Sequence, residues 1–81
     1  MIAPENIQER IEAALPGSEV VVQDLTGTQD HFQALVISEA FQGKTMVEQH
    51  QMVYRALGDF MKEAIHALAL KTFTPDQWKQ Q

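Results

Sequence analysis

Hydrophobic and polar residues follow two different periods along this chain. Near the N-terminus, apolar side chains recur three or four positions apart, which is the spacing of one face of an α-helix: Ile7, Ile11, Ala14 and Leu15. Pro4 and Glu5 suit the first turn of such a helix, and Pro16 with Gly17 ends it. The pattern predicts a first helix over about residues 4 to 15.

The period then changes to that of a β-strand. Three consecutive valines within residues 19–25 have β-branched side chains that fit a pleated, half-buried surface. From residue 31 onward, Phe32, Ala34 and Val36 alternate with His31, Gln33, Leu35 and Ile37. Because the loop at residues 26–30 is short and contains Gly27, these two strands are expected to form an antiparallel hairpin.

A helical period returns in the second half of the chain. Between residues 45 and 61 the apolar positions recur at steps of three and four: Met46, Val47, Val53, Tyr54, Leu57, Phe60 and Met61. Gly58 and Asp59 predict a break, so this segment is one long helix or two short ones.

A third strand is predicted over residues 66–73, with Leu68 and Leu70 on one face. Thr74 and Pro75 then suit the cap and first position of a short terminal helix. The order is α-β-β-α-(α)-β, and two helices packed on one face of a three-stranded sheet would bury one core. The sequence therefore predicts an α+β fold.

Composition narrows the classes of function. The 81 residues are expected to form a single domain, residues 1–81. With no cysteine, this chain alone offers neither disulfides nor a thiolate metal site. The net charge of −5 argues against a protein whose main task is to hold phosphate backbones, although a local basic patch stays open. With neither a signal-peptide pattern nor an apolar run long enough for a membrane span, a soluble, cytoplasmic protein is expected.

The segment around Gly43 and Lys44 is a weak candidate for phosphate binding. It lacks the first glycine of a P-loop, and no serine or threonine shows a histidine–carboxylate pairing, so no enzyme activity is predicted. A helix N-terminus beside Lys44 would suit a nucleic-acid phosphate. Glu48, one turn into that helix, opposes this interpretation, and basic residues do not interleave with aromatic ones.

The three histidines are the remaining candidates. His50 lies within a predicted helix, where a surface or rim position is the usual one. His31 and His66 open predicted strands, where a side chain is exposed enough to bind a metal and anchored enough to be positioned. A structural role remains the more common use of such a histidine.

Two segments together resemble the BolA family: FQGKTMVEQHQMVYRAL at residues 41–57 and IHALALKTFTPDQW at residues 65–78. The resemblance extends from Ile7 to Trp78. It implies the fold of that family, which has the order α-β-β-α-α-β and is related to the class II KH domain.

The resemblance also implies a function. BolA-like proteins partner monothiol glutaredoxins, and the pair can share a bridging [2Fe–2S] cluster. Glutaredoxin and glutathione supply thiolates, and the BolA-like partner supplies the histidine of the H-A-L motif, here His66. Such a protein is a non-enzymatic adaptor for cluster assembly, cluster transfer or iron sensing. Other members are DNA-binding regulators that use the surface around Gly43, Lys44 and the following helix, which here contains His50.

This sequence departs from the family pattern at two places. A loop position that often carries a cysteine or histidine corresponds to Thr28, a poor iron ligand, and the nearby His31 is the candidate for a second ligand. Where many relatives have arginines flanking the helix histidine, this chain has Glu48, Gln49 and Gln51, which weakens the DNA-binding interpretation. The sequence leaves open whether the protein is a monomer or a homodimer.

Overall fold

The structure is a computed structural model that describes residues 2–65 and 67–80. Its elements follow the predicted order α-β-β-α-α-β, with a short 3-10 helix η1 inserted after the second strand and a terminal helix at the end. They are α1 (Pro4–Ala14), β1 (Glu19–Asp24), β2 (His31–Ile37), η1 (Glu39–Phe41), α2 (Met46–Leu57), α3 (Phe60–Glu63), β3 (Ala67–Phe73) and α4 (Pro75–Lys79). The predicted helix break is confirmed, since α2 ends at Leu57 and Gly58 adopts a positive φ of 52°.

The three strands form one mixed sheet in the order β1-β2-β3. β1 pairs antiparallel with β2, as the short loop predicted, and Glu19 lies opposite Ile37. β3 runs parallel to β2, with His31 opposite Ala67 and Ile37 opposite Phe73. Parallel strands need a long crossover connection, and α2 with α3 provides it.

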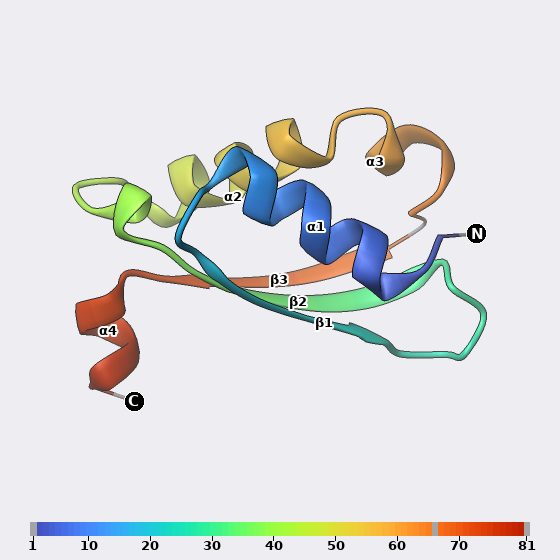
Figure 1. Ribbon diagram of the computed structural model, residues 1–81, viewed down its shortest axis with the longest axis horizontal. Helices are drawn as coiled ribbons and strands as arrows, with labels where there is room; N and C mark the ends of the chain where they lie inside the picture. Colours follow the sequence, from blue (N-terminus) through green and yellow to red (C-terminus); the bar gives the residue numbers. More distant parts are fainter. Residues whose placement is uncertain (1, 66, 81) are drawn as a thin grey trace.

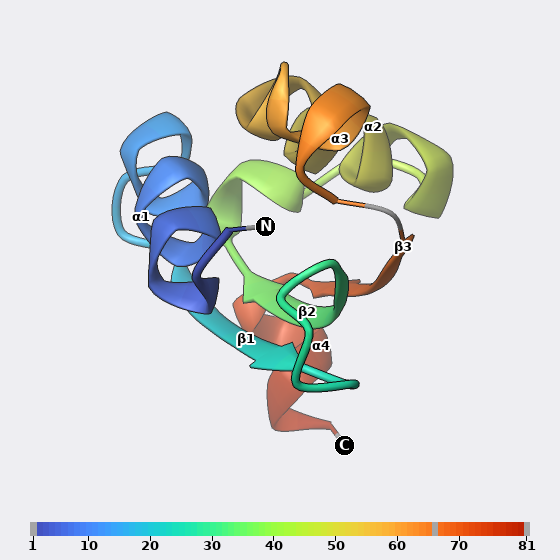
Figure 2. The same ribbon diagram turned by 90° about the vertical axis from the view of Figure 1, so that its right-hand side faces the viewer.

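The helices lie on both sides of this sheet, but unequally. Figure 1 shows α1, α2 and α3 above one face of the sheet, while α4 lies below it at one end. Figure 2, turned by 90°, shows the same division. The two-layer arrangement expected from the sequence is therefore confirmed for α1, α2 and α3, and α4 adds a small cover on the opposite face.

The core lies between the sheet and the upper helices. Phe32, Ala34 and Val36 of β2 are fully buried, as the alternation predicted. Phe32 and Val36 form one cluster with Ile7 and Ile11 of α1 and with buried residues of the other elements: Val20, Phe41, Val53, Leu57 and Ile65. Burial of large aliphatic and aromatic side chains, each contributing roughly 1.5–3 kcal/mol, is the main stabilising term for a chain of this size.

Some residues that the period assigned to an apolar face are exposed. Ala14 lies at the exposed end of α1, and Met46 and Val47 of α2 are 68% and 65% exposed. Met46 is the first residue of α2, and that helix reaches the core only from Gln49 onward. Tyr54 follows the buried Val53 by one residue and Val47 precedes the buried Gln49 by two, so at about 100° per residue both side chains point well away from the buried line.

The polar residue Gln49 occupies a core position instead. Its Nε2 donates to the Lys44 carbonyl oxygen at 3.1 Å and to the Phe41 carbonyl oxygen at 3.5 Å. Its Oε1 accepts a hydrogen bond from the Thr72 hydroxyl at 2.7 Å. Both Gln49 and Thr72 are buried, so this amide joins α2 to β3 and to the turn before α2.

Replacing Gln49 by alanine would leave the Thr72 hydroxyl and the Lys44 carbonyl without their partner inside the protein. We expect Gln49→Ala to lower the free energy of unfolding by about 2–3 kcal/mol in urea denaturation. Gln51→Ala on the exposed side of the same helix is the matched control and should change it by less than about 0.5 kcal/mol. Equal effects of the two substitutions would contradict the role assigned to the buried amide.

Candidate functional site

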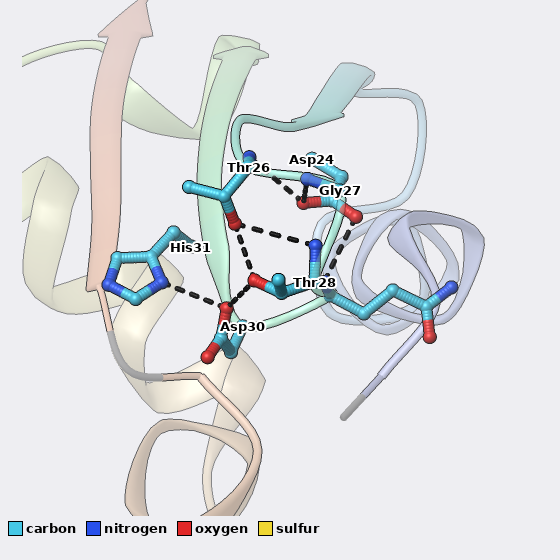
Figure 3. A network of polar contacts seen from close by, with 7 residues as sticks. Asp24, Thr26, Gly27, Thr28, Asp30 and His31 are labelled. Atoms are coloured by element: carbon cyan, nitrogen blue, oxygen red, sulfur yellow. Dashed lines mark hydrogen bonds and ion pairs between the residues drawn. The ribbon is translucent and has the colours of Figure 1, made fainter.

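The loop between β1 and β2 is held in one conformation by a single carboxylate. Oδ1 of Asp24 accepts hydrogen bonds from the backbone N–H groups of Thr26 (3.3 Å) and Gly27 (3.0 Å). Its Oδ2 accepts one from the N–H of Gln29 at 3.0 Å. Gly27 and Gln29 both have positive φ, at 79° and 60°, and the loop closes on the Asp24 side chain (Figure 3). We refer to residues 24–30 as the Asp24 loop.

A second carboxylate, that of Asp30, connects this loop to His31. Asp30 Oδ1 lies 2.9 Å from Nδ1 of His31 and also accepts a hydrogen bond from the Thr28 hydroxyl (Figure 3). The His31 side chain is 46% exposed and that of Asp30 is 27% exposed. A carboxylate beside one ring nitrogen fixes the tautomer and the orientation of an imidazole. The His31 ring is therefore held rather than freely rotating.

The same segment is tied to β3. The Asp30 carbonyl oxygen accepts a hydrogen bond from the Ala67 N–H at 3.2 Å, and Ala67 is the register partner of His31. His66, the first predicted metal ligand, lies outside the described residues. The strand that follows it in the sequence begins beside His31.

Thr28 has a structural role in this loop. Two residues that the sequence pattern did not single out organise the same polar network. The Thr28 hydroxyl is a member of the polar network, bonded to Thr26 and Asp30. Asp24 and Asp30, which organise that network, were not predicted as site residues. The signal for Asp24 was present, since an aspartate shortly before a Thr-Gly pair commonly accepts from the backbone of its own turn.

Gly43 and Lys44 lie in the turn before α2, whereas His50 lies within that helix and does not line the surface that Lys44 shares with Glu48 and Arg55. Gly43 has a φ of 75° in the turn that follows η1, and the Lys44 N–H donates to the Phe41 carbonyl oxygen at 3.1 Å. The half-buried ring of His50 meets Tyr54 edge-on, with centroids 6.4 Å apart. Figure 1 places the turn before α2 at the end of the fold opposite the Asp24 loop. The structure does not bring these residues together with His31.

The N-terminus of α2 is already capped by a carboxylate of the protein itself, that of Glu48. Thr45 and Glu48 form a capping box, in which the Thr45 N–H donates to Glu48 Oε1 at 2.8 Å and the Glu48 N–H donates to Thr45 Oγ1 at 3.2 Å. Hydrogen bonds from the Thr45 backbone and side chain, with a smaller effect of Lys44, hold the pKa of Glu48 below its ordinary value. The carboxylate thus competes with an incoming phosphate for this helix end.

Two further observations concern the part of the chain that the structure describes. Within residues 2–65 and 67–80, no three histidine, aspartate or glutamate side chains converge in a way that would hold a metal ion. Over the same residues, each helix falls short of the length and apolar character that crossing a membrane requires.

Comparison with known proteins agrees with this fold and with its sequence motifs. A family model described as "BolA-like protein" matches residues 8–77. The chain belongs to the BolA family. The resemblance stated from the two motif segments is therefore confirmed.

Individual relatives of the BolA family carry regulator names. The chain is 30% identical over 86 residues to the DNA-binding transcriptional regulator BolA of Escherichia coli, with 98% of this chain and 82% of that protein covered. It is 40% identical over 55 residues to the protein of the same name from Haemophilus influenzae. That second match covers 68% of this chain and 53% of the relative, so the chain spans about half of that regulator.

A solved BolA structure also matches over nearly the full length. The bolA protein homologue from Coxiella burnetii superimposes with a TM-score of 0.83 at 39% identity. The superposition covers 98% of this chain and 99% of that one. The predicted fold class, an α+β fold with helices on a three-stranded sheet, is confirmed.

The capping carboxylate makes stability depend on pH. A folded-state pKa below the ordinary value means that ionised Glu48 stabilises the protein above its unfolded-state pKa, and that this contribution is lost as the pH falls through the lowered value. Glu48→Gln keeps an acceptor for the Thr45 N–H but removes the charge. We expect this variant to melt at a lower temperature than wild type at pH 7, with the difference shrinking in acid.

Thermal unfolding followed by circular dichroism at several pH values would measure this difference. The control is Glu9→Gln, which removes a charge from the exposed side of α1 without touching a cap. A gap between Glu48→Gln and wild type that stays constant as the pH falls would contradict the assignment.

Proposed function

We propose that this BolA-family protein is a non-enzymatic adaptor that pairs with a monothiol glutaredoxin and shares a bridging [2Fe–2S] cluster with it. His66 is the first proposed ligand from this chain and His31 the second. The role would be cluster assembly, cluster transfer or iron sensing. The observation that carries the proposal is the Asp30–His31 pair at the strand end next to the start of β3.

The pair supports a ligand role for His31 through its geometry. Metal-binding histidines commonly place their second ring nitrogen on a carboxylate, which orients the ring and makes the other nitrogen a better ligand. Asp30 sits on Nδ1 of His31 at 2.9 Å, so Nε2 is the atom assigned to iron. Asp30 is then a positioning residue for that ligand.

The donor set fits an iron site that is completed by another molecule. Imidazole is a suitable iron ligand, and because the sequence contains no cysteine, every thiolate must come from the partner and its glutathione. A cluster ligated partly by imidazole has a higher reduction potential than one with thiolates only, and its ligation depends on proton concentration near neutral pH. The exposed His31 and Asp24 loop leave this end accessible to a partner.

The test is reconstitution with a monothiol glutaredoxin, glutathione, iron and sulfide, followed by ultraviolet–visible and circular dichroism spectra. His66→Ala is expected to abolish the spectrum of the mixed complex. His31→Ala should change that spectrum and weaken cluster retention by about tenfold or more, and Asp30→Asn should cause a smaller loss. His50→Ala, on α2 and away from this end, is the matched control and should behave as wild type.

The readouts separate the two parts of the proposal. Complex formation with glutaredoxin can be followed by gel filtration without iron, so loss of the complex is distinguishable from loss of a ligand. An unchanged mixed-complex spectrum in His66→Ala would overturn the ligand assignment, and an unchanged spectrum in His31→Ala would remove His31 from it.

A second candidate function is DNA binding, which the names of the two bacterial regulators support. Lys44 and Arg55 line one shallow surface on α2, together with Gln51 and the acidic Glu48. Two cations on a chain of net charge −5 would make few phosphate contacts. For two such contacts the slope of log affinity against log salt is about −2.

Fluorescence anisotropy with a labelled duplex at several salt concentrations would measure this slope. Lys44→Ala should lower the affinity and reduce the slope by about 1, whereas Lys71→Ala on β3 should leave both unchanged. Absence of measurable binding near physiological salt would exclude the DNA-binding function.

A further inference from the structure

A cleft of about 340 Å³ lies between the α1–β1 turn, the end of β2 and α4. Figure 1 shows the end of α1 and α4 at the same end of the sheet, away from the Asp24 loop. Leu15 and Ile37 line the cleft and are buried, and Trp78 of α4 lines it with 41% of its surface exposed. The volume is at the small end of the range for ligand sites, roughly 300–1,000 Å³. It suits one side chain rather than a cofactor.

Trp78 contributes a partly exposed aromatic ring to the lining of this cleft. Its indole is steadied by Phe73, with ring centroids 5.4 Å apart and planes tilted by 56°. The short helix that carries it begins with a capping box between Thr74 and Gln77, with Pro75 at its first position. The indole is therefore placed by local hydrogen bonds and by one aromatic neighbour. The face of an indole attracts cations more strongly than other aromatic rings do.

The mouth of the cleft is negative. Glu19 and Glu39 both line it, both are exposed, and neither forms an ion pair with a residue that the structure describes. Helix α1 ends at the same place with no basic residue in its last turn, so the partial negative charge of its C-terminus is not offset there. Lys79 is the one cation among the described residues that line the cleft. Two carboxylates and a helix end outweigh it.

We propose that this cleft binds a lysine or arginine side chain of a partner polypeptide. Such a side chain has an apolar stem and a charged head. The stem would lie on Leu15 and Ile37, the head would stack against Trp78, and the positive charge would meet Glu19 and Glu39. An acidic or neutral polar side chain would have neither the cation–ring interaction with Trp78 nor the attraction to the two carboxylates.

This site is independent of the proposed iron site. The cleft contains Ile37, at the end of β2, whereas His31 begins the same strand. Seven residues of a strand span roughly 20 Å. A partner held at the cleft and a partner held at the Asp24 loop would therefore contact different ends of the molecule, and either proposal can fail without the other.

Trp78 makes the test direct, because it is the only tryptophan in the sequence. The probe is an acetylated and amidated peptide, Gly-Leu-Arg-Leu-Gly, titrated while tryptophan emission and the amide signals in a ¹H–¹⁵N spectrum are followed. The comparison peptide carries citrulline in place of arginine, which removes the charge and keeps the shape. We expect saturable binding of the arginine peptide, with signal shifts at the cleft residues, and about fivefold weaker binding of the citrulline peptide.

The variants assign the binding to the cleft. The double variant Glu19→Gln, Glu39→Gln should bind the arginine peptide about fivefold more weakly, and Glu9→Gln on the exposed side of α1 should bind it as wild type does. Unperturbed ¹H–¹⁵N spectra of the free variants would show that each is folded. Equal affinity for both peptides would indicate an apolar ligand site and overturn the proposal. Absence of saturation, or signal shifts confined to other surfaces, would also overturn it.

Discussion

The parallel pairing of β2 with β3 is the constraint on which the rest of this structure depends. Parallel neighbours cannot be joined by a tight turn, so the chain must leave the sheet, cross over it and return. Helices α2 and α3 make this crossover and, in doing so, cover the face on which Phe32 and Val36 are buried. The register that results sets Ala67 opposite His31 and Phe73 opposite Ile37. Both ends of the sheet, and the surfaces built there, follow from that register.

The acidic side chains of this chain are used in three different ways. Asp24 closes a loop by accepting backbone N–H groups, Glu48 caps a helix, and Asp30 orients an imidazole ring. Each of these carboxylates accepts hydrogen bonds from fixed donors of the protein and so orders the segment around it. Glu19 and Glu39 stand apart from this group, because neither side chain forms a hydrogen bond or an ion pair with a described residue. The acidic composition alone therefore does not identify a binding partner, because several of the carboxylates have structural roles within the protein.

The two ends of the sheet differ in chemistry. At the β1–β2 end, an exposed histidine is held by a carboxylate and backbone groups are fixed by Asp24. At the other end, Trp78 stands over an apolar cleft with a negative mouth. The first arrangement suits a metal ligand that works with ligands from a partner, and the second suits recognition of a basic side chain. Because the strands hold the two ends apart, one small domain has room for a different partner at each end.

Much of the fold follows from the sequence alone, because periodicity, turn residues and caps are local properties. The sequence predicts three local features that the structure confirms: the alternation through Phe32, Ala34 and Val36, the helix break at Gly58, and the Thr74 cap. The two BolA motifs indicate the family, and the position of His31 at the start of a strand makes it a candidate metal ligand.

The tertiary structure alone decided which helical residues reach the core: Met46 falls outside it and the polar Gln49 lies inside, bonded to Thr72 on a distant strand. It also decided the parallel course of β3 and the meeting of Asp30 with Ala67. These outcomes depend on contacts between segments far apart in the chain, whose energies no local pattern records.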